Sequence, residues 1–142
     1  MPFVRISAAA THTDEELTAL SDSVFEAIVD VLDKPGDMRF ESIETYDPSR
    51  LQFHRSFIGV AETASSVFVH ITLSHGRTTG QRRALHTAVS KNIRRAIGLT
   101  SPDLVILINE RGAPAFSFGD GESRYLSRAA QTNGTSHGGP SH

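Results

Sequence analysis

The stretch Met1-Pro2-Phe3-Val4-Arg5-Ile6 determines how the rest of the chain is interpreted. The apolar run that starts at Phe3 is typical of a buried strand. A small second residue such as proline usually permits removal of the initiator methionine, which would leave Pro2 with a free secondary amine. An α-amino group has an ordinary pKa of about 7.7–8.0, and desolvation or a nearby cation lowers it. Pro2 is therefore a candidate catalytic base. The alternative is that Pro2 is an ordinary second residue without a catalytic role.

The length and composition indicate one globular domain. The chain has 142 residues, of which 38% are hydrophobic and 21% charged. The net charge of −2 and the pI near 6.4 argue against nucleic acid as the main partner. No apolar run approaches the roughly 18 residues of a membrane span, and no secretory signal is recognisable. We therefore expect a cytoplasmic protein without a membrane partner.

The chain contains no cysteine, which excludes disulfides, thiol catalysis and cysteine-ligated metal sites. His54, His70 and His86 lack the partner spacing of a metal site. We therefore expect no metal centre.

Two parts of the chain repeat one pattern, 65 residues apart. Thr13 is followed three residues later by Glu16, and Thr78 by Gln81, and both pairs fit a capping box. Apolar residues at helical spacing follow each box, over 17–32 and 85–97. Gly98 is a typical helix end. The repeat predicts two amphipathic helices in equivalent positions.

Strand patterns flank each predicted helix. They cover residues 3–6, 38–46, 66–73 and 104–108, and the last run is apolar throughout, which indicates a central strand. Residues 51–64 fit no single period and are interpreted as a long loop. Strand–helix–strand crossovers are almost always parallel and right-handed. The sequence therefore predicts an α/β (α+β) fold, a tandem βαβ repeat with a four-stranded mixed sheet and two helices on one face.

The other face of such a sheet needs a cover. Oligomerisation is the cover we expect, because large exposed apolar faces are rare in monomers. We expect one domain over 2–128, with halves at about 2–48 and 66–110 followed by an aromatic-glycine segment at 116–121. The Gly-, Ser- and His-containing tail, 129–142, is expected to be disordered.

The order and spacing of several short motifs resemble the tautomerase superfamily, whose members have an amino-terminal proline. The resemblance is closest to the malonate semialdehyde decarboxylase group and spans roughly residues 2–128. The matching motifs are Met-Pro-Phe-Val-Arg-Ile at 1–6, Thr-Asp-Glu-Glu-Leu at 13–17, Pro-Gly-Asp at 35–37 with Arg-Phe at 39–40, Gly-Arg-Thr at 76–78 with Gln-Arg-Arg at 81–83, Phe-Ser-Phe-Gly-Asp-Gly at 116–121, and Tyr-Leu at 125–126.

This resemblance implies a tautomerase/MIF-like fold, a homotrimer and a cofactor-free enzyme acting on a small carboxylate substrate. Carried over by position, Pro2 is the general base or acid, and Arg77 binds the substrate carboxylate. Asp37 matches an aspartate that positions or activates water. The apolar pocket wall would contain Phe116, Phe118 and Tyr125.

The chain departs from the decarboxylase pattern at two positions. His75 stands where those enzymes have a second arginine, and Phe116 stands where they have a tryptophan. A histidine can replace part of the missing charge or transfer a proton near pH 6–7. His75 is therefore a candidate for substrate binding, and tautomerisation, decarboxylation and hydration all remain open.

Each candidate also has a plainer interpretation. Arg77 and His75 are equally consistent with a solvated loop, Asp37 with an ordinary turn, and the phenylalanines with a core or subunit interface. Arg82, Arg83, Arg94 and Arg95 are interpreted as the solvated face of the second helix. A ligand-binding or regulatory module without turnover is the alternative function.

Overall fold

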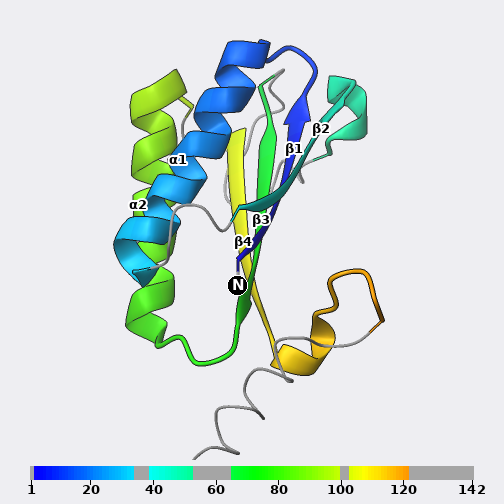
Figure 1. The fold of residues 1–142 in the computed structure, drawn as a ribbon. Coiled ribbons are helices and arrows are strands. Elements are labelled where there is room, and N and C mark those ends of the chain that lie inside the picture. Colours follow the sequence, from blue (N-terminus) through cyan, green and yellow to red (C-terminus); the bar gives the residue numbers. More distant parts are fainter. Residues whose placement is uncertain (1, 34–38, 53–64, 100–102, 122–142) are drawn as a thin grey trace, which may run out of the picture.

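The computed structural model describes residues 2–33, 39–52, 65–99 and 103–121 (Figure 1). These residues form β1 (Phe3–Ala9), α1 (Asp14–Leu32), β2 (Phe40–Tyr46), β3 (Val67–Ser74), α2 (Thr79–Ile97) and β4 (Leu104–Arg111), with short 3-10 helices η1 (Pro48–Arg50) and η3 (Ala113–Ala115). The predicted loop at 51–64 lies almost entirely outside the described residues. The part of the chain that the structure describes contains no helix that is both long and apolar enough to cross a membrane.

The four strands form one mixed sheet in the order β2-β1-β3-β4. β1 pairs with β2 in parallel and β3 with β4 in parallel, as the repeat predicts. The two halves meet at the antiparallel pair β1–β3, where Phe3 lies opposite Thr72. Both helices cover the same face of the sheet (Figure 1). The predicted fold class is therefore confirmed.

Both helices begin at the predicted capping boxes. The Thr13 hydroxyl accepts a hydrogen bond from the Glu16 N–H at 3.1 Å, and the Glu16 carboxylate accepts one from the Thr13 N–H at 3.0 Å. Thr78 and Gln81 make the same pair of bonds at 3.0 and 2.9 Å. Each box pairs two amides that a helix start otherwise leaves without partners.

The core lies between the helices and the sheet face that they cover. Alternate residues of β1 and β3 point into it, and matching residues of the helices complete it, because a strand has a side-chain period of two and a helix one of 3.6. The largest fully buried side chains are Val4, Ile6, Val67, Val69, Ile71 and Leu73 from the strands and Leu20, Val24, Ile28, Leu85, Val89 and Ile93 from the helices.

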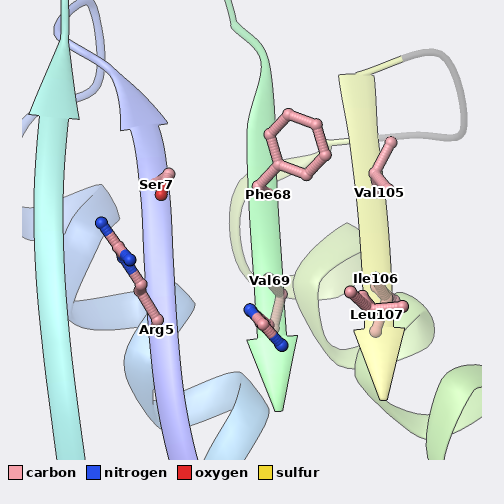
Figure 2. Close-up of a pocket in the computed structure, with 8 residues that line it drawn as sticks. Arg5, Ser7, Phe68, Val69, Val105, Ile106 and Leu107 are labelled. Atoms are coloured by element: carbon pink, nitrogen blue, oxygen red, sulfur yellow. The ribbon is translucent and has the colours of Figure 1, made fainter. Parts of the chain in front are cut away.

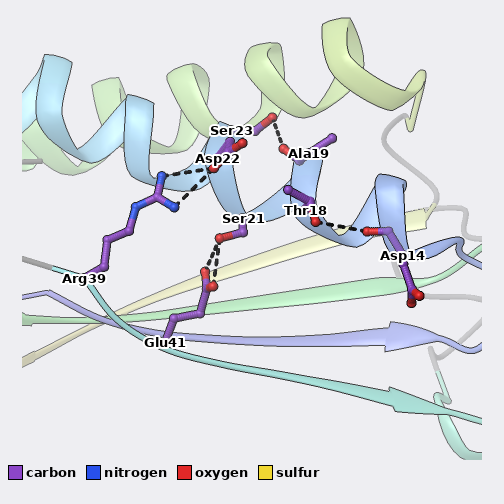
Figure 3. Close-up of polar contacts among 8 residues, drawn as sticks. All are labelled: Asp14, Thr18, Ala19, Ser21, Asp22, Ser23, Arg39 and Glu41. Carbon is purple, nitrogen blue, oxygen red and sulfur yellow. Dashed lines mark hydrogen bonds and ion pairs between the residues drawn. The ribbon is translucent and has the colours of Figure 1, made fainter. Parts of the chain in front are cut away.

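Polar contacts attach β2 to α1. The buried Ser21 hydroxyl donates to the Glu41 carboxylate, with distances of 2.7 and 2.6 Å to its two oxygens. Arg39 contacts one carboxylate oxygen of Asp22 at 3.1 Å (Figure 3). The Arg39 guanidinium also lies 4.6 Å from the centre of the Phe25 ring. These contacts position the start of β2 beside the helix.

The prediction that 104–108 forms a central strand is wrong, because β4 is an edge strand. Its run is apolar on both faces for two different reasons. Ile106 and Ile108 pack against the core, whereas Leu107 points to the opposite face and is 54% exposed. An uninterrupted apolar run shows that both faces are apolar and does not show how many strands lie beside it.

The face of the sheet that the helices leave uncovered carries a hollow of ≈ 340 Å³. Figure 2 shows its lining on three neighbouring strands, from Arg5 and Ser7 on β1 through β3 to Leu107 on β4. The Nε2 atom of His70 is buried there and has no hydrogen-bond partner among the described residues. We call this surface the open face.

Candidate functional site

The candidate site lies at one end of the sheet, where β1 begins. Pro2 is buried directly before the first residue of β1. Because β3 runs antiparallel to β1, the end of β3 lies beside the start of β1, with Phe3 opposite Thr72. The N-terminus, the connection from β3 to α2 and η3 all lie at this end (Figure 1). The topology therefore brings Pro2 and the loop that contains His75 and Arg77 to the same end of the sheet.

Arg77 precedes the N-cap of α2 and is half-buried. Its Nε atom is buried and has no hydrogen-bond partner among the described residues. An unpaired buried N–H of a cation is costly unless a ligand or water satisfies it. The Arg77 side chain therefore has an unused donor of the kind that binds a carboxylate.

His75 lies in the same loop with 69% of its side chain exposed. Its backbone N–H donates to the Arg111 carbonyl at 3.2 Å, which attaches the loop to the end of β4. Its Nδ1 atom lies 3.9 Å from an oxygen of Glu110. The imidazole of His75 thus stands at the rim of the site rather than inside it.

Two charged residues that sequence reasoning did not place at the site meet beside this loop. Arg82 lies on the first turns of α2, and its Nη1 atom is 3.2 Å from a carboxylate oxygen of Glu110 on β4. The same nitrogen donates to the Arg77 carbonyl at 2.8 Å. Arg82 thus belongs only in part to the predicted solvated surface, because its side chain is 38% exposed and also makes these two contacts. The one signal in the sequence is that Glu110 lies two residues after Ile108, as Ile108 lies two residues after Ile106, so that all three are expected on the same face of the strand.

Three aromatic rings connect the start of the sheet with the segment after β4. The Phe3 and Phe40 rings are stacked with centroids 5.5 Å apart, and Phe40 meets Phe118 at 5.5 Å. Phe118 thus lies against Phe40, the first residue of β2, and Phe40 in turn stacks on Phe3, which directly follows Pro2 in the chain. Phe116 is half-buried in the same segment. The geometry brings Phe118 to the proline end of the sheet, and its place in a pocket wall stays a prediction.

Two predicted site residues, Asp37 and Tyr125, lie outside the described residues. No three histidine, aspartate or glutamate side chains in the described ranges are grouped as ligands for a metal ion.

Comparison with known proteins identifies the family. A family model described as "Tautomerase enzyme" matches residues 38–119. The chain belongs to the tautomerase family. This tautomerase is 26% identical over 126 residues to the "Probable tautomerase YusQ" of Bacillus subtilis (strain 168), a match that covers 89% of this chain and 99% of the relative.

Solved structures agree with this assignment. The tautomerase chain superposes on FG41 malonate semialdehyde decarboxylase inhibited by 3-bromopropiolate with a TM-score of 0.80 and 28% identity, over 89% of this chain and 96% of that one. It also superposes on a "Q0 fused 4-OT wild type symmetric trimer" with a TM-score of 0.71 and 18% identity, over 89% and 99% of the two chains. The second likeness concerns the fold alone. The predicted resemblance to the tautomerase superfamily is thus confirmed, and the protein is an enzyme of this family.

Proposed function

We propose that this tautomerase is a cofactor-free enzyme in which Pro2 moves a proton on a small oxo-acid or enol-acid whose carboxylate is bound by Arg77. The observation that carries the proposal is the buried Nε of Arg77, which has no hydrogen-bond partner among the described residues and lies in the loop beside the start of β1. A substrate carboxylate would supply the missing acceptor. Pro2 is buried at the same end of the sheet, where a neutral amine is favoured over a charged one.

The chemistry needs Met1 to be removed, so that Pro2 carries a free amine. In ketonisation of an enol-acid, the hydroxyl loses a proton as the carbonyl forms, and the α-carbon gains one. Pro2 accepts one proton and delivers one, which leaves its own protonation state unchanged over the cycle. The fixed charge of Arg77 stabilises negative charge on the enolate, an effect that mutagenesis in other enzymes values at about 10²–10³ in rate.

The same residues suit a second outcome on a β-keto acid. The inhibited relative is a malonate semialdehyde decarboxylase, and loss of CO₂ from such a substrate also forms an enolate that a cation stabilises. Asp37 would position water for hydration, and Phe116, Phe118 and Tyr125 would form the apolar wall. His75 in place of a second arginine weakens the binding of a substrate carboxylate by positive charge. We therefore propose tautomerisation ahead of decarboxylation.

The open face supports association into a homotrimer. Leu107 is 54% exposed on it, and the buried Nε2 of His70 has no partner among the described residues. Large exposed apolar side chains on a sheet face favour burial against another copy. Fused 4-OT chains with this fold form symmetric or asymmetric trimers.

The test is an assay of Met1-free protein with phenylenolpyruvate and with malonate semialdehyde. Pro2→Ala should lose about 10²–10⁴ in rate, the range for a general base. Arg77→Ala should raise KM and lower kcat/KM. Arg83→Ala, an exposed arginine on α2, is the matched control and should retain full activity. Full turnover by Pro2→Ala would refute the proposal. No turnover of either compound by the unaltered protein would favour a ligand-binding module.

A further inference from the structure

We propose that Arg82 and Glu110 are positioning residues that hold Arg77 in place for the substrate carboxylate without touching the substrate. This inference rests on the proposed function of Arg77. It concerns a pair of residues that join α2 to β4 directly beside the Arg77 loop. We call the pair the Arg82–Glu110 brace.

Arg82 contacts both the Arg77 loop and the sheet. The Arg82 Nη1 atom donates to the Arg77 carbonyl at 2.8 Å and lies 3.2 Å from Glu110 Oε1. Glu110 is 19% exposed and Arg82 38% exposed, so both side chains are partly withdrawn from solvent. Charge-assisted hydrogen bonds of this kind are shorter and stronger than neutral ones. One guanidinium therefore links the backbone of Arg77 to a strand of the sheet.

Gly76 gives the backbone before Arg77 a conformational freedom that the Arg82–Glu110 brace limits. Gly76 directly precedes Arg77 and has a φ of 110°, a conformation in which glycine is favoured. The loop is fixed on its other side by the capping box of Thr78. Between these two points the Arg82–Glu110 brace holds the Arg77 carbonyl. Without it, rotation about the Gly76–Arg77 region would let the Arg77 side chain leave its half-buried position.

Glu110 also affects the charge that the two neighbouring arginines present. Arg77 and Arg82 are two cations beside the candidate site, and either could attract a substrate carboxylate. The Glu110 carboxylate accepts a hydrogen bond from Arg82 and partly neutralises its charge. The Arg77 Nε, in contrast, has no hydrogen-bond partner among the described residues. Glu110 is also 3.9 Å from His75 Nδ1. The carboxylate of Glu110 thus assigns substrate binding to Arg77 and keeps Arg82 from competing for it.

The first measurement follows the Arg77 Nε–H itself by ¹⁵N NMR, with its signal assigned from its loss in Arg77→Lys. Because this atom is buried, its proton should exchange slowly with water. In Arg82→Gln and in Glu110→Gln, local opening should make that exchange on the order of tenfold faster. Arg82→Lys keeps a cationic donor and should restore much of the protection. Arg83→Gln is the matched control and should leave the exchange unchanged.

The second measurement compares KM and kcat for phenylenolpyruvate in the same variants, with thermal unfolding recorded for each. Loss of the brace should raise KM on the order of tenfold and change kcat less, because Pro2 is untouched. The double variant Arg82→Gln/Glu110→Gln should resemble either single variant rather than add their effects, since the two residues act as one unit.

The outcomes separate this inference from the proposed function. Unchanged Nε–H exchange in both brace variants, or a signal that already exchanges too fast to observe in the unaltered protein, would overturn the brace whatever the activity. Faster exchange with an unchanged KM, while Arg77→Ala raises KM, would overturn it as a determinant of substrate binding. If Arg77→Ala itself leaves KM unchanged, the proposed role of Arg77 fails, and with it the substrate-positioning role of the brace.

Discussion

Replacing Phe40 with alanine removes the ring that connects the start of β1 with the segment after β4. Phe40 stacks on Phe3 at 5.5 Å with an interplanar angle of 14°, and meets Phe118 at 5.5 Å and 50°. A fully buried Phe→Ala change costs about 3–5 kcal/mol. Phe40 is only half-buried, so about half of that cost, ~2 kcal/mol, is expected. Part of this cost is the loss of the two ring pairs, each of which contributes about 0.5–1.5 kcal/mol in addition to the burial of apolar area.

The assay is denaturant unfolding at a fixed protein concentration, since association with other copies would add concentration-dependent stability. A double-mutant cycle of Phe40→Leu with Phe118→Leu isolates the ring pair and should give a coupling of about 0.5–1.5 kcal/mol. The same cycle of Phe40→Leu with Leu107→Ala, on the opposite edge strand, is the control. Its coupling should stay within about 0.3–0.5 kcal/mol.

A Phe40–Phe118 coupling no larger than this control would show that the ring pair does not stabilise the fold. It would mean that the rings touch without energetic consequence and that the aromatic segment is held by other contacts. If the coupling is as expected, Phe40→Leu should also raise KM for phenylenolpyruvate, because Phe118 belongs to the proposed pocket wall.

Three further predictions concern the caps and the open face. The Thr13 backbone N–H, with a smaller contribution from His12, lowers the pKa of Glu16. The ionised Glu16 carboxylate therefore stabilises the folded chain above the ordinary glutamate pKa of about 4.3. This stabilisation is lost as the pH falls through the lowered pKa of the folded state. Unfolding between pH 3 and 7 should show Glu16→Gln less stable than the unaltered protein only at the higher pH, and a constant difference would contradict this. Gly98→Ala should lower the free energy of unfolding by about 1 kcal/mol, because Gly98 has a φ of 71°. Gly80→Ala should raise it by about 0.4–1 kcal/mol, because the added Cβ makes only an ordinary van der Waals contact. Equal effects of the two variants in thermal unfolding would contradict this difference. Leu107→Asp should convert an oligomer to a smaller species in light scattering, and an unchanged mass would exclude the open face as the subunit interface.

The elements that sequence predicts well are those specified by residues close together in the chain. The capping boxes need a threonine and a Glu or Gln three residues apart, and both are present as expected. The equivalence of the two halves follows from the same spacing, and it predicts two parallel strand pairs. Local chemistry therefore accounts for the helices and for the fold class.

The misjudged features depend on contacts between distant residues. The apolar run of β4 has the composition of a central strand, but its exposed Leu107 faces the open side of an edge strand. Arg82 follows the polar face of α2, and only the folded chain brings it to Glu110, 28 positions further along the chain. The burial of Arg77 Nε likewise depends on how its loop packs. Apart from the alternation that puts Glu110 in phase with Ile106 and Ile108, such contacts leave no periodic trace in the sequence.

The central claim is that a free proline amine at the start of β1 performs the proton transfer. The most direct test is kcat/KM for phenylenolpyruvate in two proteins that differ by one residue inserted between Met1 and Pro2, with intact mass confirming each N-terminus. The insertion turns the Pro2 amine into a non-basic amide while Arg77 and the fold remain. We predict that the inserted form loses at least about 10² in kcat/KM. Equal activity of the two proteins would contradict the account and require another base.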